Sequence, residues 1–370
     1  MTRLTNEQYR ELTAEKVAAA EAVLTDEVAD LVTGEDWRQF LDYQAKFYDL
    51  DAHNVLLVVA QHLSAYGQGR VPDPAPSYVA GFDTWKALGR HVERGQHGYT
   101  ILVPRRAARW DAHDAPGRPQ AIRRDETPGA GEVEAQAAAR RRWRPETVFA
   151  RSQTAGREVA EPARPRLGPG DAPVGLKEAV AELIEAQGWK VTTVFDASSL
   201  DGADSRTYYG GQFIDVRADL DDAALVKTLV HQAAHVLLHG GTPGRYLSQT
   251  VKEVEADSVA YVVAAAHAMP TDGYRFPEVA RWAGEQGDPA HKDRAVRDTQ
   301  ARISRAAQAI IAASPAEHGP GSKPPGADLA LAAMRQIDQE AAARKAELLD
   351  RMAGRDEMPA PPRVDGPEVA

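Results

Sequence analysis

Two histidines in the chain are spaced so that they could bind one metal ion, and the glutamine between them would limit the chemistry of that site. His231 and His235 are four residues apart, so on a helix both imidazoles lie on one face and can reach one ion. In the H-E-x-x-H arrangement of zinc peptidases, the glutamate after the first histidine takes a proton from the attacking water. Gln232 occupies that position here, and a neutral amide cannot take the proton. The pattern predicts a zinc site with severely reduced hydrolysis.

A third metal ligand is expected on the next predicted helix, which carries three carboxylates. Glu253 and Asp257 share one face, whereas Glu255 is turned by about 200° from Glu253. We assign Glu253 as the ligand and Asp257 as the acceptor for a ligand histidine. For Glu255 the alternative of a position on a solvated, acidic face of the helix remains open. Small residues on the Glu253 side would let the two helices approach closely: Ala256, Ala260 and Ala264.

Each of these residues also has a non-catalytic explanation. His231 and His235 could satisfy local hydrogen bonds without any metal. His239 lies in the last turn before Gly240, where an imidazole can interact with free carbonyls and the helix dipole, and we favour this role over a fourth ligand. Gln232 is compatible with a site that was never catalytic, with natural loss of activity or with a deliberate replacement.

The composition restricts the kind of site and partner. The 370-residue chain has no cysteine, so a zinc site must use histidines and carboxylates, and a reducing compartment is expected. With 44 basic and 54 acidic residues the net charge is −10, so nucleic-acid binding would need a local basic surface. The amino terminus lacks the apolar core of a signal peptide, and the apolar runs are too short to span a bilayer. We expect a cytoplasmic protein without a membrane partner.

The apolar patterns predict an α+β fold in two domains with a helical extension. The first domain, residues 1–160, has an Arg-rich insertion at about 105–145 that is too poor in apolar residues to form a core. A Pro/Gly-rich linker at 161–175 precedes the second domain, residues 176–312. Residues 313–370 are expected to form a Pro/Gly linker, a helix and a disordered tail.

Periodicity and capping residues place the elements within these domains. In the first domain, we expect helices over residues 12–31, 37–48, 55–60 and 85–91, the last two capped by Asn54 and Asp83, and strands over 99–103 and 147–149. In the second domain, we expect helices over 176–187, 222–239 and 251–269 and strands over 190–195 and 212–216. The last helix is expected over about 328–352.

Several motifs together resemble the ArdC-type antirestriction proteins. These proteins join an amino-terminal single-stranded-DNA-binding domain to a carboxy-terminal zincin-like metallopeptidase domain. The similar segments lie between Trp37 and Trp282 and are interrupted by the Arg-rich insertion and the linker: residues 37–44, 54–57, 81–90, 148–156, 227–239 and 253–263. Gln232 departs from the family pattern, because such families usually place a glutamate there.

The resemblance implies binding of single-stranded DNA, which requires cations along the phosphate track and aromatic faces for the bases. The cations that we assign to this role cluster around Trp85: Lys86, Arg90, Arg94, Arg105 and Arg106. Trp37, Phe40 and Trp85 fall on apolar helical faces and are expected in the core. The Arg run at 140–144 is either a flexible contact to DNA or a solvated linker.

These observations leave three functions open. The first is a single-stranded-DNA-binding, antirestriction-type protein of mobile genetic elements whose zinc-binding domain is a pseudoenzyme. The second is an active zinc metallopeptidase that cleaves a repressor or a restriction component, with another carboxylate or a ligand-bound hydroxide in place of the missing base. The third is a noncatalytic interaction module that the metal only stabilises.

Overall fold

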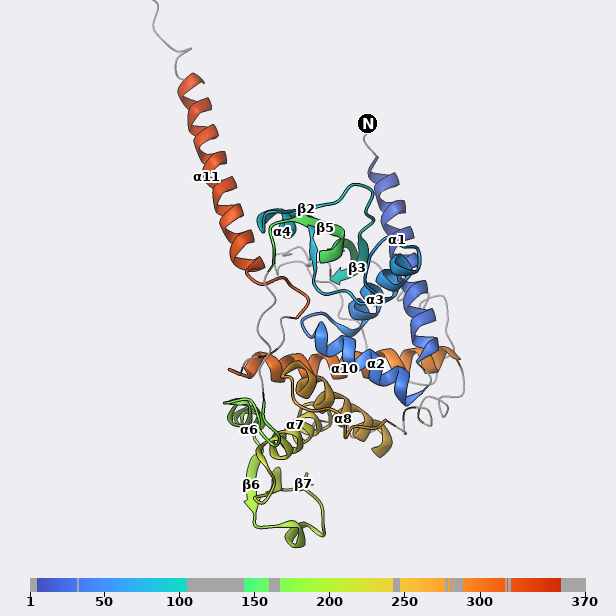
Figure 1. Cartoon of the computed structure of the whole chain (residues 1–370), viewed down its shortest axis with the longest axis vertical. Coiled ribbons are helices and arrows are strands. Elements are labelled where there is room, and N and C mark those ends of the chain that lie inside the picture. Colours follow the sequence, from blue (N-terminus) through green and yellow to red (C-terminus); the bar gives the residue numbers. More distant parts are fainter. Residues whose placement is uncertain are drawn as a thin grey trace, which may run out of the picture.

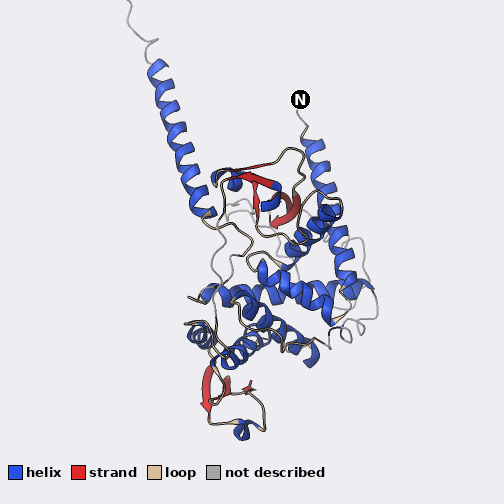
Figure 2. Ribbon diagram, in the orientation of Figure 1, coloured by secondary structure: helices blue, strands red, loops and turns tan. Residues whose placement is uncertain are grey.

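The protein has an α+β fold in which helices predominate and the strands form small, separate sheets (Figure 2). The computed structural model describes residues 5–31, 33–104, 143–159, 167–241, 247–276, 279, 282, 289–316, 318 and 321–353. The predicted Arg-rich insertion and the last residues of the predicted tail lie almost wholly outside these ranges. Within the described part of the chain, every helix is too short or too polar to cross a membrane.

Three helices open the chain: α1 (Asn6–Asp30), α2 (Gly34–Lys46) and α3 (Ala52–Gly67). Asp51 caps α3 by accepting a hydrogen bond from the backbone of Asn54 (3.0 Å), so the expectation that Asn54 is the cap was wrong. The Asn54 amide instead bonds the N–H (2.8 Å) and the C=O (2.9 Å) of Leu102. It therefore ties α3 to a strand distant in sequence.

The amino-terminal strands form two antiparallel sheets. The first has the order β1 (Val79–Gly81), β4 (Trp143–Ala150) and β3 (Tyr99–Pro104), and in the second β2 (Arg90–Val92) pairs with β5 (Thr154–Gly156). A short 3₁₀ helix, η1 (Arg151–Gln153), links β4 to β5. Helix α4 (Phe82–Ala87) ends earlier than expected, because Gly89 has a φ of 75° and turns the chain into β2.

The second half begins with α6 (Leu176–Ala186) and a three-stranded sheet of order β6-β8-β7. Strand β8 (Phe213–Arg217) runs parallel to β6 (Lys190–Val194) and antiparallel to β7 (Ser205–Tyr208), and the 3₁₀ helix η2 (Ala197–Leu200) precedes β7. Strand β7 was not expected from the sequence. All four of its residues are half-buried. Its sequence, Ser-Arg-Thr-Tyr, does not alternate between apolar and polar residues, and this alternation is the signal by which a strand is predicted.

Four more helices complete the described chain: α7 (Asp222–His239), α8 (Gln249–Ala266), α10 (Pro289–Ala313) and α11 (Ala327–Ala353). Helix α10 was not expected as a separate element. In Figure 1, α2 and α10 cross the middle of the molecule, between the amino-terminal sheets and the pair α7 and α8, and α11 projects from the body. Helix α8 thus contacts α7, α10 and α2.

One hydrophobic core joins the two halves of the chain. It contains residues of α1, α2 and α3 together with residues of α6, α7, α8 and α10. Trp37 on α2 is fully buried, its indole N–H donates to Ser258 Oγ on α8 (2.9 Å), and its ring meets Trp282 edge-on. Tyr261 on α8 donates to Asp42 on α2 (2.6 Å). This packing crosses the domain boundary expected at residues 161–175.

The segment before α11 is also bound to the amino-terminal half. Ser322 donates its backbone N–H and its hydroxyl to the carboxylate of Asp49, at 2.5 and 2.8 Å. The Ser322 carbonyl accepts from the backbone of Val79 on β1 (2.8 Å). Residues 321–327 therefore form part of the folded body and hold the start of α11 near α4.

His62 is a buried imidazole between α3 and β3. Its Nε2 lies 2.8 Å from the carbonyl of Asp73 and its Nδ1 lies 2.8 Å from the Tyr99 hydroxyl. A carbonyl only accepts hydrogen bonds, so Nε2 carries the proton and Nδ1 accepts from the tyrosine. Burial lowers the pKa of His62 below its ordinary value.

We expect acidification to destabilise the protein in part through His62. Below its unfolded-state pKa of about 6.5, the unfolded chain binds a proton that the folded chain excludes. The stability present above that pH is therefore lost as the pH falls toward the lowered folded-state pKa. In urea unfolding across this range, His62→Gln should reduce the slope of the unfolding free energy against pH by at most about 1.4 kcal/mol per pH unit.

The matched control is His91→Gln, because His91 is exposed on β2 and keeps its contact with water in both states. That variant should retain the slope of the unaltered protein. An identical slope for His62→Gln and the unaltered protein would contradict the assignment.

Candidate metal centre

The candidate metal centre lies between α7 and α8, which pack side by side. Asp221 caps α7 by accepting from the backbone of Ala224 (2.7 Å), and Ser248 caps α8 through Val251. Ala256 and Ala260 are buried in the core, and their small side chains permit the close approach that the sequence predicted. The imidazoles of α7 therefore face the carboxylates of α8.

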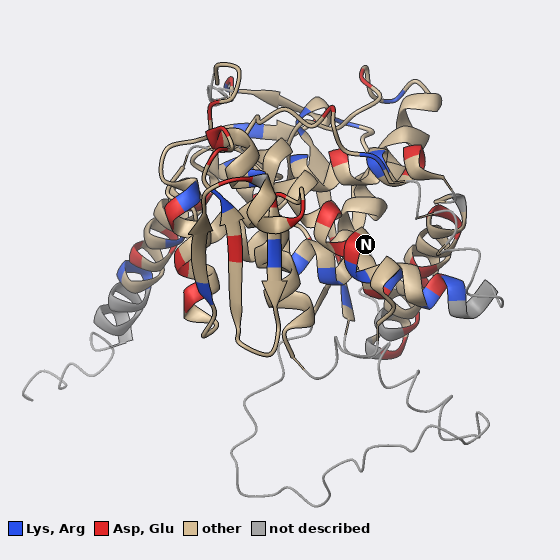
Figure 3. Ribbon diagram, turned by 90° about the horizontal axis from the view of Figure 1, so that it is seen from below, with Lys and Arg blue, Asp and Glu red and all other residues tan. Residues whose placement is uncertain are grey.

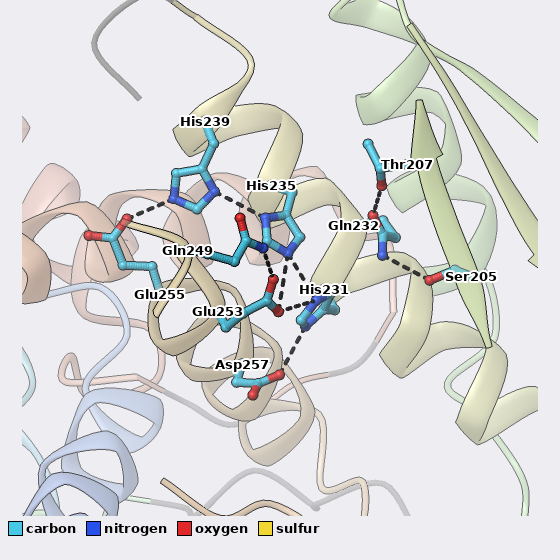
Figure 4. A network of polar contacts seen from close by, with 10 residues as sticks. All are labelled: Ser205, Thr207, His231, Gln232, His235, His239, Gln249, Glu253, Glu255 and Asp257. Atoms are coloured by element: carbon cyan, nitrogen blue, oxygen red, sulfur yellow. Dashed lines mark hydrogen bonds and ion pairs between the residues drawn. The ribbon is translucent and has the colours of Figure 1, made fainter. Parts of the chain in front are cut away.

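Three donor atoms converge between these helices (Figure 4). The Nε2 atoms of His231 and His235 are 3.0 Å apart, and Glu253 Oε2 lies 3.5 Å from the first and 3.7 Å from the second. Donors of a tetrahedral zinc ion, each 2.0–2.1 Å from the metal, are about 3.3 Å apart. The three distances bracket that separation, so these residues could hold one metal ion.

Charge at the site is arranged for a cation. Burial disfavours the charged form of His231, but hydrogen bonds to Asp257 and Glu253 outweigh that effect and raise the pKa of His231 to about 9. Hydrogen bonds to His231 and His235 lower the pKa of Glu253, and burial lowers the pKa of His235. The carboxylate is therefore ionised, and a metal ion would take the place of the imidazole proton.

Asp257 orients one of the two histidines. Its Oδ1 lies 2.9 Å from Nδ1 of His231, which leaves Nε2 of that ring directed at the other two donors. A carboxylate behind a ligand histidine fixes the orientation of the ring and raises its basicity. The structure thus brings Asp257 to the place where an acceptor was expected from the sequence.

His239 and Glu255 have contacts that were not expected from the sequence. The ring nitrogens of His239 lie 3.1 Å from Nδ1 of His235 and 2.9 Å from Oε2 of Glu255. Glu255 is fully buried, and its Oε1 accepts from Arg302 Nε on α10 (2.6 Å). The solvated face considered for Glu255 was wrong, because α10 covers it. The expectation that His239 turns to the carbonyls at the end of α7 was wrong as well, because its ring points between the two helices.

Gln232 points away from the three donor atoms, toward β7 (Figure 4). Its amide nitrogen donates to Ser205 Oγ (2.8 Å), and its amide oxygen accepts from the hydroxyl of Thr207. Both ends of the amide are thus bound by side chains of β7. Ser205 and Thr207 were missed at the level of sequence because this strand was not expected.

A cleft of about 700 Å³ opens over the three donor atoms. It is lined by β7, α7, α8 and the segment that contains Tyr274. Tyr209 is half-exposed at this cleft, and the ammonium of Lys227 lies 5.8 Å from the ring centroid of Tyr274. The site is therefore open to a molecule much larger than water.

The residues assigned to DNA binding lie in a different part of the structure. Lys86 on α4 and Arg94 after β2 are exposed. The Arg90 guanidinium is instead bound to β5, with Nε donating to Thr154 Oγ1 (2.8 Å) and Nη1 to the Arg157 carbonyl (2.6 Å). Its donors hold β2 and β5 together. Arg105 and Arg106 lie outside the described residues, as does most of the Arg run at 140–144.

We expect Glu253 to be required for stabilisation by a divalent metal ion. A ligand that binds only the folded state at about 100 times its dissociation constant adds about 2.7 kcal/mol to the unfolding free energy. Added zinc or manganese should raise the melting temperature of the unaltered protein, and EDTA should reverse the shift. Glu253→Ala should abolish the shift, whereas Glu182→Ala, which removes an exposed carboxylate of α6, should retain it. An equal shift in both variants would contradict the site.

Comparison with known proteins gives a likeness of fold. One similar structure is that of the Mn(II)-bound antirestriction protein ArdC from the R388 plasmid, at 16% identity over 75% of this chain and 97% of that chain, with a TM-score of 0.38. The metal-free structure of ArdC is similar at 18% identity over 70% of this chain and 84% of that chain, with a TM-score of 0.39. No protein-family model and no curated protein matches the chain. Because the sequence identities and TM-scores are low, the chemistry of the site has to be judged from this chain's own residues.

Proposed function

We propose that this chain is an antirestriction-type protein that binds single-stranded DNA and holds Zn²⁺ at His231, His235 and Glu253, with peptide hydrolysis impaired at Gln232. The observation that carries the metal site is the convergence of three donor atoms between α7 and α8. The antirestriction role comes from the resemblance of the sequence motifs.

The donor set supports zinc as the metal. Two imidazole nitrogens and one carboxylate oxygen are a recurrent zinc set in metallopeptidases, with a fourth position left for water or substrate. Zinc bound in this way would supply a Lewis acid to a substrate in the cleft. Because the chain has no cysteine, a site of this kind has to be built from histidines and carboxylates.

The environment of Gln232 supports impaired hydrolysis. A general base contributes roughly 10² to 10⁴ in rate, and an amide cannot serve as one. The amide is also held by Ser205 and Thr207, so it is not free to orient a water molecule over the donor atoms. The site can therefore retain its metal while it lacks the group that activates water.

Two exposed cations support the DNA-binding role. Lys86 and Arg94 flank the short β2 strand, and Phe82, an exposed aromatic residue, lies one helical turn before Lys86. Elsewhere the Lys and Arg positions are interspersed with Asp and Glu positions along the described ribbon (Figure 3). With a net charge of −10, affinity for DNA would have to arise from such a local group of cations.

The first test restores the missing base. We expect the unaltered protein with zinc to show no measurable cleavage of a fluorogenic peptide library. Gln232→Glu should show metal-dependent cleavage, because a general base contributes roughly 10² to 10⁴ in rate. Because the Ser205 and Thr207 hydroxyls would donate to the new carboxylate and weaken it as a base, the gain should be larger when Ser205→Ala is combined with Gln232→Glu.

Glu253→Ala in the Gln232→Glu background serves as the control and should remove the activity. Metal-dependent cleavage by the unaltered protein would instead favour the active metallopeptidase. A Gln232→Glu variant that binds metal but cleaves no peptide would favour the noncatalytic module.

The second test measures binding of a fluorescent oligothymidine by anisotropy over a range of salt concentrations. We expect salt-sensitive binding that persists after chelation of the metal, since the cations are separate from the metal centre. Replacing Lys86 and Arg94 by alanine should weaken binding and reduce the slope of log K against log salt by about 0.7 for each phosphate that is no longer neutralised.

Lys190→Ala is the matched control, because Lys190 is an exposed cation on β6, in the metal-binding half of the chain. That variant should bind like the unaltered protein. Absence of binding to any single-stranded oligonucleotide at low salt would overturn the DNA-binding role and leave the metal centre unaffected.

A further inference from the structure

We propose that a buried chain of hydrogen bonds from Arg302 through Glu255 and His239 selects the tautomer of His235 that can bind metal. Arg302 on α10 contacts Glu255 on α8. Figure 4 shows the next two contacts, from Glu255 to His239 and from His239 to the ligand His235, both on α7. This inference rests on the proposed metal site and deepens it. It makes His239, Glu255 and Arg302 positioning residues.

The direction of each hydrogen bond follows from the chemistry of the end groups. A guanidinium only donates and an ionised carboxylate only accepts. Glu255 accepts from Arg302 at Oε1 (2.6 Å), so its Oε2, 2.9 Å from His239 Nε2, must receive a proton from that ring. His239 therefore carries its proton on Nε2 in the neutral form and has a lone pair on Nδ1.

The position of the His239 proton also fixes which nitrogen of the ligand histidine, His235, carries a proton. His239 Nδ1 lies 3.1 Å from His235 Nδ1, and two lone pairs cannot form a hydrogen bond, so His235 Nδ1 carries the proton. Its Nε2 is then left with a lone pair. That atom is one of the three donors at the metal centre, 3.7 Å from Glu253 Oε2.

Burial of the hydrogen-bonded groups leaves His235 with a single favourable tautomer. The side chains of His239 and Glu255 are fully buried, so water is excluded as an alternative partner, and a buried group left without a partner there would destabilise the fold. His231 has a simpler arrangement, in which the half-exposed Asp257 accepts directly from Nδ1. The two ligand histidines are thus held by two carboxylates on different sides of α8.

The decisive variant is Glu255→Gln. Arg302 only donates, so the amide oxygen has to face Arg302 and the amide N–H₂ has to face His239. That N–H₂ needs an acceptor, which moves the His239 proton to Nδ1 and the His235 proton to Nε2, where it blocks metal binding. We expect metal affinity, measured by competition with a chromophoric chelator, to fall by about 10- to 100-fold.

A second variant tests whether metal affinity falls because the hydrogen bonds reverse direction or because the local structure is damaged. With Arg302→Met added to Glu255→Gln, the amide can rotate and present its oxygen to His239, which restores the original direction. Metal affinity should then recover toward that of the unaltered protein. A merely structural role predicts that removing a second group leaves the affinity as low or lowers it further.

A readout without metal tests the same chain. In metal-free protein labelled with ¹⁵N-histidine, long-range ¹H–¹⁵N spectra should show the His235 proton on Nδ1 in the unaltered protein and on Nε2 in Glu255→Gln, and on Nδ1 again in the double variant. Melting temperatures of all variants establish that each is folded.

The proposal is overturned if folded Glu255→Gln keeps both its metal affinity and the Nδ1 tautomer, or if the double variant shows no recovery. Failure of the unaltered protein to bind zinc or manganese would sink the proposed metal site instead. In that case the His235 tautomer still reports whether Glu255 sets the direction of the chain, so the two failures are distinguishable.

Discussion

The packing of α8 between α7, α10 and α2 is the contact on which the rest of the structure depends. Small residues let α8 approach α7 closely, and polar groups on its other sides are satisfied by the neighbouring helices. Glu253 and Asp257 of α8 contact His231 on α7. Glu255 contacts His239 on α7 and Arg302 on α10. On the side that faces α2, Ser258 accepts from Trp37 and Tyr261 donates to Asp42. A shift of α8 would disturb the metal donors and the shared core together.

The candidate metal donors and the side chain of Gln232 lie on different sides of α7. His231 and His235 face α8, whereas Gln232, between them in sequence, faces β7. A different side chain at position 232 therefore need not disturb the three donor atoms. Because Ser205 and Thr207 satisfy both ends of the amide, glutamine is accommodated there without an unpaired polar group.

The amino-terminal half is held by buried contacts to the half that contains the candidate metal centre. The indole N–H of Trp37 and the hydroxyl of Tyr261 both find partners across this junction, in a region where unpaired polar groups are costly. The two halves share one core. The exposed cations Lys86 and Arg94 belong to α4 and to the turn after β2, and these elements lie on the opposite side of that core from α7 and α8 (Figure 1).

The sequence by itself determined which residues of α7 and α8 could share a face, because helical spacing is local: His231 with His235, and Glu253 with Asp257. It also determined the apolar positions of Trp37 and Trp85. Only the tertiary structure decided the partners of Gln232, His239 and Glu255, since these come from β7, α8 and α10, which are distant in the chain or lack a clear pattern. Local spacing specifies a face, but the neighbour that covers the face is chosen by packing of the whole core.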